Sequence, residues 1–167
     1  MTKKRGFEIV SSYEGEGIHL PERATERSAG YDLEAAKTVT LPSIWRFLSE
    51  GNERESSDDF LKSTLVPTGI KAYMPDDEVL ILANRSSNPM KRGLALPNGI
   101  GVIDADYYGN EGNEGEIFVQ LINYGAEDFT IQKGDRIAQG IFMKYGTVDQ
   151  ESLPKAKREG GFGSSGY

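Results

Sequence analysis

The apolar residues of this chain occur in short runs that are separated by turn residues. Residues 78–87 (EVLILANRSS) and 115–124 (GEIFVQLINY) each hold one strand-length run, and residues 129–143 hold two runs around Lys133-Gly134. Runs of this length without intervening helical segments are typical of β-sandwiches, jelly rolls and barrels. The chain has 20 glycines among 167 residues, enough for the many turns of such a fold. We therefore predict an all-β body.

Further segments show the same strand texture at residues 6–13, 31–33, 37–41, 64–75 and 94–110. The last of these is expected to be a hairpin. Its central pair, Asn98-Gly99, tolerates the positive φ angles that a type I′ turn requires.

Residues 43–63 interrupt the strand pattern with a charged stretch that is less β-like. Ser43 is expected to cap one short helix, and Ser57 is expected to cap a second. Asp58 and Asp59 would lie in the first turn of the second helix, where acidic residues suit the helix dipole. We interpret residues 43–63 as a short helical insertion between two strands.

The residue counts exclude several kinds of site. Without cysteine there are no disulfides, thiolate metal sites or cysteine nucleophiles, and His19 is the single histidine. The net charge of −7 favours a small anionic ligand over DNA or RNA, because nucleic-acid-binding proteins usually present a basic face. No apolar stretch approaches the ~20 residues of a membrane span, and the N-terminus lacks the apolar region of a signal peptide. We expect a soluble, cytoplasmic protein without a membrane partner, organised as one domain over residues 1–167.

Arg85-Ser86-Ser87 follows a strongly apolar strand. A guanidinium fork and two hydroxyls at the end of a rigid strand are suited to phosphate oxygens. The alternative is an ordinary polar turn.

Asp104 and Asp106 occupy alternate positions of one expected strand and would share a face. Two such carboxylates suit a general base, a magnesium contact, or both. The alternative is the acidic edge of a strand.

Residues 134–139 (GDRIAQ) form a turn that enters a strand. The alternative for this segment is that Asp135 and Arg136 pair with each other on the surface and that Gln139 faces solvent.

The glycine- and serine-rich end of the chain could bind an anion through its backbone amides. In this segment Phe162 could stack on a flat base, and Arg158 supplies a positive charge. The alternative for this end is a flexible terminus.

Taken in order, these segments resemble the five motifs of the trimeric dUTPase family. The matching segments are 29–33, 85–87 with 91–94, 101–110, 134–139, and Arg158 with 160–166. The resemblance covers nearly the whole chain except residues 43–63, and five ordered motifs are more specific than any one of them. Ser165 departs from the usual threonine but keeps the hydroxyl, and the insertion is longer than the usual turn.

The resemblance implies a jelly-roll-like, distorted β-barrel that assembles as a homotrimer with active sites between subunits. A mobile C-terminal arm, residues 158–167, would close over a site built by other subunits. The implied reaction is the magnesium-dependent hydrolysis of dUTP to dUMP and pyrophosphate.

The resemblance also implies a role for each matched residue. Asp104 matches the general base, Gln139 a polar contact beside the catalytic water, and Asp32 a carboxylate linked to Mg2+ through water. The implied substrate-binding residues are Arg85, Ser86 and Ser87 for phosphates, Asn98 for the uracil edge, Gly101 in the hairpin, Tyr107 for the deoxyribose, Phe162 for the base, and Arg158, Gly163, Ser164 and Ser165 for the terminal phosphates.

Two rival functions remain open at the level of sequence. One is a dCTP deaminase of the same fold, which requires a glutamate placed to activate water at the cytosine ring. The other is a regulatory protein that binds a partner through the insertion, where Trp45, Phe47 and Phe60 stand among charged residues. The alternative for these aromatics is that they only anchor the insertion to the body.

Overall fold

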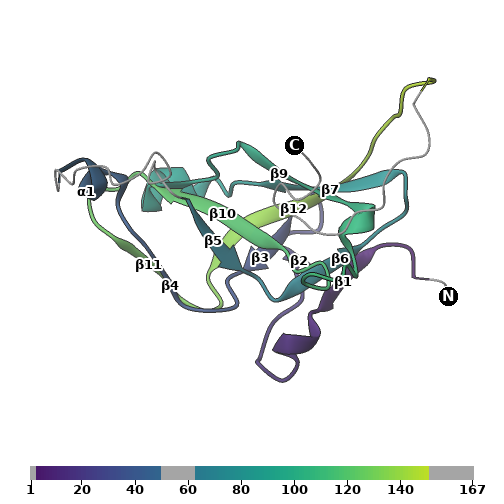
Figure 1. The fold of residues 1–167 in the computed structure, drawn as a ribbon, viewed down its shortest axis with the longest axis horizontal. Coiled ribbons are helices and arrows are strands. Elements are labelled where there is room, and N and C mark those ends of the chain that lie inside the picture. Colours follow the sequence, from purple (N-terminus) through teal and green to yellow (C-terminus); the bar gives the residue numbers. More distant parts are fainter. Residues whose placement is uncertain (1–2, 50–62, 151–167) are drawn as a thin grey trace.

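The computed structural model describes residues 3–49 and 63–150, and strands dominate this part of the chain (Figure 1). The strands are β1 (Gly6–Ile9), β2 (Glu22–Arg23), β3 (Tyr31–Glu34), β4 (Val39–Leu41), β5 (Thr64–Pro67), β6 (Ile70–Tyr73), β7 (Glu78–Ala83), β8 (Leu94–Ala95), β9 (Ile100–Asp104), β10 (Phe118–Asn123), β11 (Phe129–Ile131) and β12 (Arg136–Lys144). Short helical segments lie between them: η1 (Ser11–Tyr13), α1 (Ile44–Ser49), η3 (Asn88–Arg92) and η4 (Ala105–Tyr107). The expectation of an all-β body is confirmed.

The described strands form antiparallel sheets whose neighbours are often distant in sequence. The largest sheet has the order β2-β3-β12-β7-β9, and a second sheet has the order β5-β10-β8. Two further pairs, β1 with β6 and β4 with β11, complete the body. In this topology β12 lies between β3 and β7, so segments that are far apart along the chain meet at the centre of the largest sheet.

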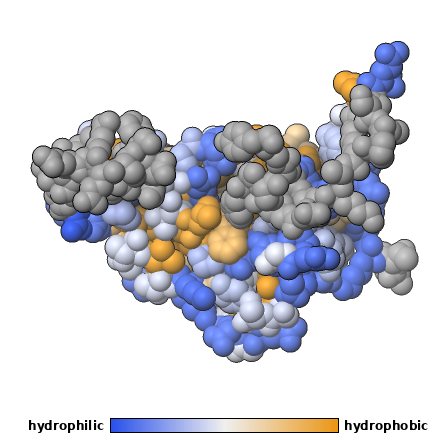
Figure 2. Space-filling view, in the orientation of Figure 1, coloured by the Kyte–Doolittle hydropathy of each residue, from blue (hydrophilic) through white to orange (hydrophobic). Residues whose placement is uncertain are grey.

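One apolar cluster joins the sheets. Leu80 and Leu82 of β7 point inward, and they pack in the same core as Val119 and Leu121 of β10 and Ile137 of β12. Burying each such side chain contributes about 1.5–3 kcal/mol, so this cluster is the main source of the fold's stability. On the outside, Figure 2 shows hydrophobic atoms gathered near the centre of the visible face, with hydrophilic atoms around them.

The expected hairpin at residues 94–110 is wrong in its pairing. β8 pairs with β10 and β9 pairs with β7, so the two strands do not pair with each other. The turn spans residues 96–99, with the Gly99 N–H donating to the Leu96 carbonyl oxygen at 3.1 Å. The central residues of this turn are Pro97 and Asn98, one residue earlier than the expected pair Asn98-Gly99. Proline fixes a negative φ, so a type I′ turn is excluded, and within residues 96–99 only Gly99 has a positive φ.

Two other expected strands are shorter or divided. The strand expected over residues 6–13 ends at Ile9, and η1 follows it. The segment 64–75 contains β5 and β6, separated at Gly69, whose φ of 65° breaks the extended backbone.

The cap expected at Ser43 is present. The Trp45 N–H donates to Ser43 Oγ at 3.2 Å at the start of α1. The Trp45 indole N–H donates to the Tyr124 carbonyl oxygen at 2.9 Å, which fits the anchoring alternative for this aromatic. Phe60 and the second helix expected from Ser57 lie outside the described residues. None of the helices in residues 3–49 and 63–150 has the length and apolarity of a membrane span.

Candidate active site

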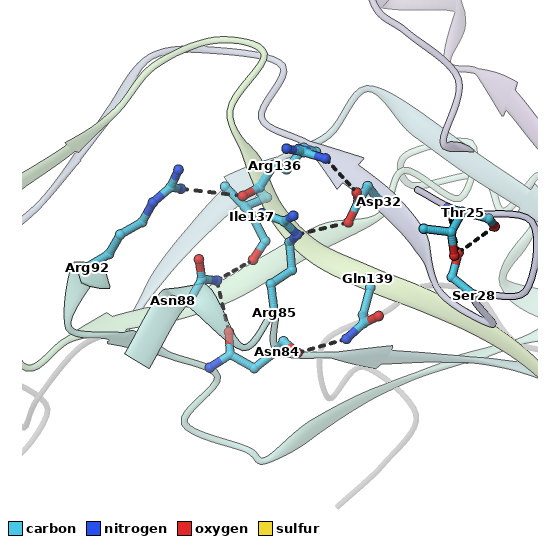
Figure 3. A network of polar contacts seen from close by, with 10 residues as sticks. All are labelled: Thr25, Ser28, Asp32, Asn84, Arg85, Asn88, Arg92, Arg136, Ile137 and Gln139. Carbon is cyan, nitrogen blue, oxygen red and sulfur yellow. Dashed lines mark hydrogen bonds and ion pairs between the residues drawn. The ribbon is translucent and has the colours of Figure 1, made fainter. Parts of the chain in front are cut away.

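Three neighbouring strands bring distant polar residues together at one end of the largest sheet. Gln139 of β12 lies opposite Asp32 of β3 on one side and opposite Ala83 of β7 on the other. Arg85 follows the end of β7 by two residues, so it reaches the same place (Figure 3). The register of β12 therefore sets the geometry of this cluster.

Asp32 is the centre of the cluster because two guanidinium groups share its carboxylate. Arg85 Nε donates to Asp32 Oδ1 at 2.9 Å, and Arg136 Nη1 donates to Asp32 Oδ2 at 3.1 Å. The Asp32 side chain is only 16% exposed. Charge-assisted bonds of this kind are stronger than neutral ones, so Asp32 restrains the position of the Arg85 guanidinium.

Gln139 is held beside this cluster by a backbone contact and by a glycine. Its Nε2 donates to the Asn84 carbonyl oxygen at 3.1 Å. A Cβ added at Gly30 would lie 2.2 Å from Gln139 Oε1, closer than any real contact. Gly30 is thus required for Gln139 to keep this position.

A buried asparagine fixes the segment that carries Arg85, Ser86 and Ser87. Asn88 Nδ2 donates to Asn84 Oδ1 at 2.9 Å and to the Ile137 carbonyl oxygen at 2.8 Å, tying this segment to β12 (Figure 3). Ser86 is exposed and Ser87 is half-buried at the end of β7.

Arginines concentrate at this end of the sheet. Arg92 Nη1 donates to the Arg136 carbonyl oxygen at 3.4 Å, so a third arginine lies next to the pair of arginines that Asp32 holds. Guanidinium groups at this strand end are suited to phosphate oxygens, although Glu22 and Glu34 lie on neighbouring strands.

Asp104 lies at the other end of the same sheet. In the β7–β9 register Asp104 faces Val79, whereas Ile100 faces Ala83 next to Arg85. Four residues of antiparallel strand span about 14 Å, so Asp104 and Arg85 of one chain do not converge on one small ligand atom.

The remaining residues of this segment have distinct environments. Tyr107 is buried in η4, with 3% exposure, and its hydroxyl donates to the Glu116 carbonyl oxygen at 2.8 Å. Asn98 is exposed in the turn at residues 96–99. Gly101 has a packing reason, since a Cβ there would lie 3.1 Å from Leu82 Cβ.

The structure thus gathers Asp32, Arg85, Ser86, Ser87 and Gln139 at one end of the sheet and places Asp104 and Tyr107 at the other. The arm residues assigned from the sequence lie outside the described residues: Arg158, Phe162, Gly163, Ser164 and Ser165.

The sequence alternative for Arg136 is wrong. Arg136 pairs with Asp32 across the strands, while Asp135 Oδ2 accepts from the Gln132 N–H at 3.0 Å. Sequence reasoning also missed Asn84 and Asn88. Their signal is that they flank the Arg85 segment four residues apart.

The acidic residues fit a metal ion that arrives with its phosphates better than a resident one. Within residues 3–49 and 63–150, no three histidine or carboxylate side chains converge as a ligand set. Both Asp32 oxygens accept from guanidinium groups, so Asp32 suits hydrogen bonds from metal-bound water rather than direct ligation. Mg2+ commonly keeps several waters and is bound by one or two carboxylates together with substrate phosphates.

Comparison with known proteins decides the family. The model of the dUTPase family matches residues 58–166. The chain belongs to the dUTPase family. A curated relative, the deoxyuridine 5'-triphosphate nucleotidohydrolase of Lactococcus lactis subsp. lactis, is 47% identical over 98% of this chain and 99% of its own length. The corresponding Rickettsia felis protein is 42% identical over 88% of each chain.

Solved structures agree with this family. The crystal structure of dUTPase from Streptococcus mutans superposes with a TM-score of 0.73 at 41% identity, covering 87% of this chain and 99% of that one. The dUTPase from phage phi11 of S. aureus, solved to visualise its species-specific insert, superposes with a TM-score of 0.65 at 18% identity, covering 93% of this chain and 99% of that one. This second likeness concerns the fold alone. Together with the described strands, these dUTPase structures confirm the jelly-roll-like fold.

Proposed function

We propose that this chain hydrolyses dUTP to dUMP and pyrophosphate by attack of water on the α-phosphorus. The observation that carries the proposal is the cluster of Arg85, Asp32 and Arg136 beside Gln139 in a chain of the dUTPase family. The cluster supplies positive charge at a polar strand end, which suits a triphosphate. The name of the Lactococcus lactis relative, deoxyuridine 5'-triphosphate nucleotidohydrolase, agrees with this substrate.

In this proposal Arg85, Ser86 and Ser87 bind phosphate oxygens. Asp32 accepts a hydrogen bond from Arg85 Nε and thereby orients the rest of the guanidinium. The carboxylate thus contributes to binding by position, without itself meeting the anionic phosphates.

Asp104 acts as the general base and Gln139 as a polar contact beside the attacking water. A carboxylate is a weak base, so the main task of Asp104 is to orient the water in line and to accept its proton as the new bond forms. Mg2+, when bound, neutralises triphosphate charge and polarises the α-phosphorus. Asp32 would hold that ion through water. A mutant dUTPase of phage phi11 coordinates a structural Mg(II) ion, which supports a role for magnesium in the family.

We further propose that the active chain is a homotrimer whose sites combine residues of different subunits. The strand length of about 14 Å between the Arg85 end of β7 and Asp104 supports this, because one chain does not bring both groups to one phosphorus. β9 also lies at the edge of its sheet and exposes half of Ile100 and Val102. An edge strand with exposed apolar side chains is suited to a subunit contact.

The base and sugar are assigned to the remaining residues. The Asn98 amide both donates and accepts, as the uracil edge requires, and Tyr107 packs under the deoxyribose. Gly101 lets the backbone approach the base. The residues of the arm, over 158–167, would contact the base through Phe162 and the phosphates through Arg158, Gly163, Ser164 and Ser165. We place the reaction in the cytoplasm, where deoxynucleotides are made, with residues 1–167 acting as one unit.

The test is release of pyrophosphate from dUTP, with dCTP, dTTP and UTP in parallel, with and without Mg2+. The proposal expects hydrolysis of dUTP alone, supported by Mg2+. Ammonia is followed in the dCTP sample, since its release would favour the deaminase alternative. A folded protein that hydrolyses none of the four nucleotides would overturn the proposal.

A further inference from the structure

Behind Tyr107, residues 110–116 form a loop that is closed by its own asparagines. Asn110 Nδ2 donates to Asn113 Oδ1 at 2.8 Å, and the Asn113 N–H donates back to Asn110 Oδ1 at 3.1 Å. Asn113 Oδ1 also accepts from the Gly115 N–H at 3.1 Å. Both amide side chains are thereby fixed in one orientation.

This loop holds Tyr107 at two points. Asn113 Nδ2 donates to the Tyr107 hydroxyl at 2.8 Å, while that hydroxyl donates to the Glu116 carbonyl oxygen at 2.8 Å. Asn110 Nδ2 donates to the Tyr107 carbonyl oxygen at 2.8 Å. Because the phenol is buried, a shift of the ring would leave polar groups unpaired at low dielectric.

The loop carries backbone strain that the surrounding structure restrains. Glu114 is the one non-glycine residue with positive φ, 58°, in the described part of the chain. Its Oε2 accepts from both the Ser11 N–H at 2.8 Å and the Ser11 hydroxyl at 2.9 Å. These bonds, followed by Lys71, hold the pKa of Glu114 below its ordinary value. At Gly115, where φ is 88°, a Cβ would lie 2.6 Å from the Tyr107 carbonyl oxygen. Strain of this kind persists where the surroundings over-determine a conformation, often near a functional site.

We propose that Asn113 is a positioning residue that sets the sugar specificity of the enzyme by fixing the height of the Tyr107 ring. The inference rests on the proposed function, in which Tyr107 forms the floor under the deoxyribose. A ribose differs by one oxygen atom, so a floor that is fixed to within a fraction of an ångström excludes it and a loose floor admits it.

The experiment compares Asn113→Asp, Tyr107→Phe, the double variant and the control Ser11→Ala. Asn113→Asp keeps an acceptor for the Gly115 N–H but removes the N–H that is donated to Tyr107. The new carboxylate then competes with the Glu116 carbonyl for one hydroxyl proton. Ser11→Ala removes the hydroxyl bond to Glu114 and so loosens the same loop, but it removes no bond to Tyr107. The Ser11 N–H still donates to Glu114 in this variant. The readouts are kcat/KM for dUTP and for UTP, together with Tm.

The net contribution of one hydrogen bond corresponds to about a fivefold change in an equilibrium or rate constant. Asn113→Asp and Tyr107→Phe should therefore each lower the dUTP-to-UTP ratio of kcat/KM about fivefold. The double variant should be no less selective than the worse single variant, and Ser11→Ala should keep the wild-type ratio.

An Asn113→Asp protein with a lower Tm but the wild-type ratio would overturn the inference, as would equal loss of selectivity in Ser11→Ala. Measurements on the wild-type protein distinguish failure of the proposed function from failure of the inference about Asn113. If it does not hydrolyse dUTP in preference to UTP, the proposed function fails and the inference falls with it. If it does, the variants test Asn113 alone.

Discussion

The Arg85 guanidinium is fixed by Asp32, with Arg85 Nε lying 2.9 Å from Asp32 Oδ1, and the second carboxylate oxygen holds Arg136 at 3.1 Å. The strands β3 and β12 are adjacent, so this one carboxylate joins the segment after β7 to both of them. The position of Arg85 is therefore a property of the sheet as well as of its own loop.

Asp32→Asn should weaken substrate binding more than it weakens the fold. The neutral amide keeps one acceptor oxygen and presents an NH2 group to the other guanidinium, so it cannot hold both arginines, and the weakened orientation of Arg85 should raise KM for dUTP about tenfold. Steady-state kinetics measure this change. Glu34→Gln is a matched control on the same strand, because the Glu34 carboxylate lies 3.1 Å from His19 Nδ1, whereas both arginines bond Asp32. A wild-type KM in Asp32→Asn would contradict the orienting role.

Gly30→Ala should displace Gln139 and lower kcat about tenfold to a hundredfold, because a shift of about 1 Å at a reacting centre has effects of that size. The reason is steric, since the added Cβ meets Gln139 Oε1 at 2.2 Å. Gly146→Ala is the control, because a Cβ there meets nothing within 4 Å. Unchanged kcat in Gly30→Ala would show that Gln139 is not needed where the structure places it.

The sequence predicted local features well and long-range pairing poorly. The apolar run in residues 79–83 predicted β7 correctly, because a strand-length apolar run bounded by polar residues is a local signal. The hairpin at Asn98-Gly99 failed because the partners of β8 and β9 are β10 and β7, which no local pattern encodes.

The candidate site shows the same division. Arg85 and Gln139 stand out through their motifs, but the contact from Arg136 to Asp32 depends on the register of β12 against β3. The role of Asn113 depends on hydrogen bonds within its own loop. In the sequence this loop is visible only as a repeated pattern of asparagine and glycine.

Glu116→Gln should remove a pH dependence of stability. Burial raises the pKa of Glu116 above its ordinary value of 4.5, and the bonds from the Gly69 N–H and Tyr13 lower it by less. The folded state thus holds the proton more tightly than the unfolded state. The stability from this proton is fully present below pH 4.5 and is lost as the pH rises through the raised value.

Glutamine is neutral throughout and keeps an acceptor for Gly69. Relative to wild type, the free energy of unfolding of Glu116→Gln should therefore increase from pH 4.5 upward and then level off, as measured by urea titration at several pH values. Glu114→Gln is the contrasting variant, because its pKa is lowered and its trend should have the opposite sign. A pH-independent difference for Glu116→Gln would contradict the buried charge.

Deletion of residues 158–167 should leave the fold intact and remove most turnover. The described apolar core is built from residues between Leu33 and Ala138, whereas the proposed contacts to the phosphates and base depend on the arm. Loss of these contacts should lower kcat/KM for dUTP about a hundredfold, with little change in Tm. Full activity in the truncated protein would show that the arm is dispensable.

The most direct test of the account is complementation between two inactive variants, Arg85→Ala and Asp104→Asn. Asp104→Asn alone should bind nucleotide and fold normally but lose most turnover. If each site takes Arg85 from one subunit and Asp104 from another, co-expressed variants should regain roughly a quarter of wild-type activity, because random assembly leaves that share of sites intact. Activity that stays at the level of the single variants would contradict the composite site and would indicate that Arg85 and Asp104 of the same chain act in one active site.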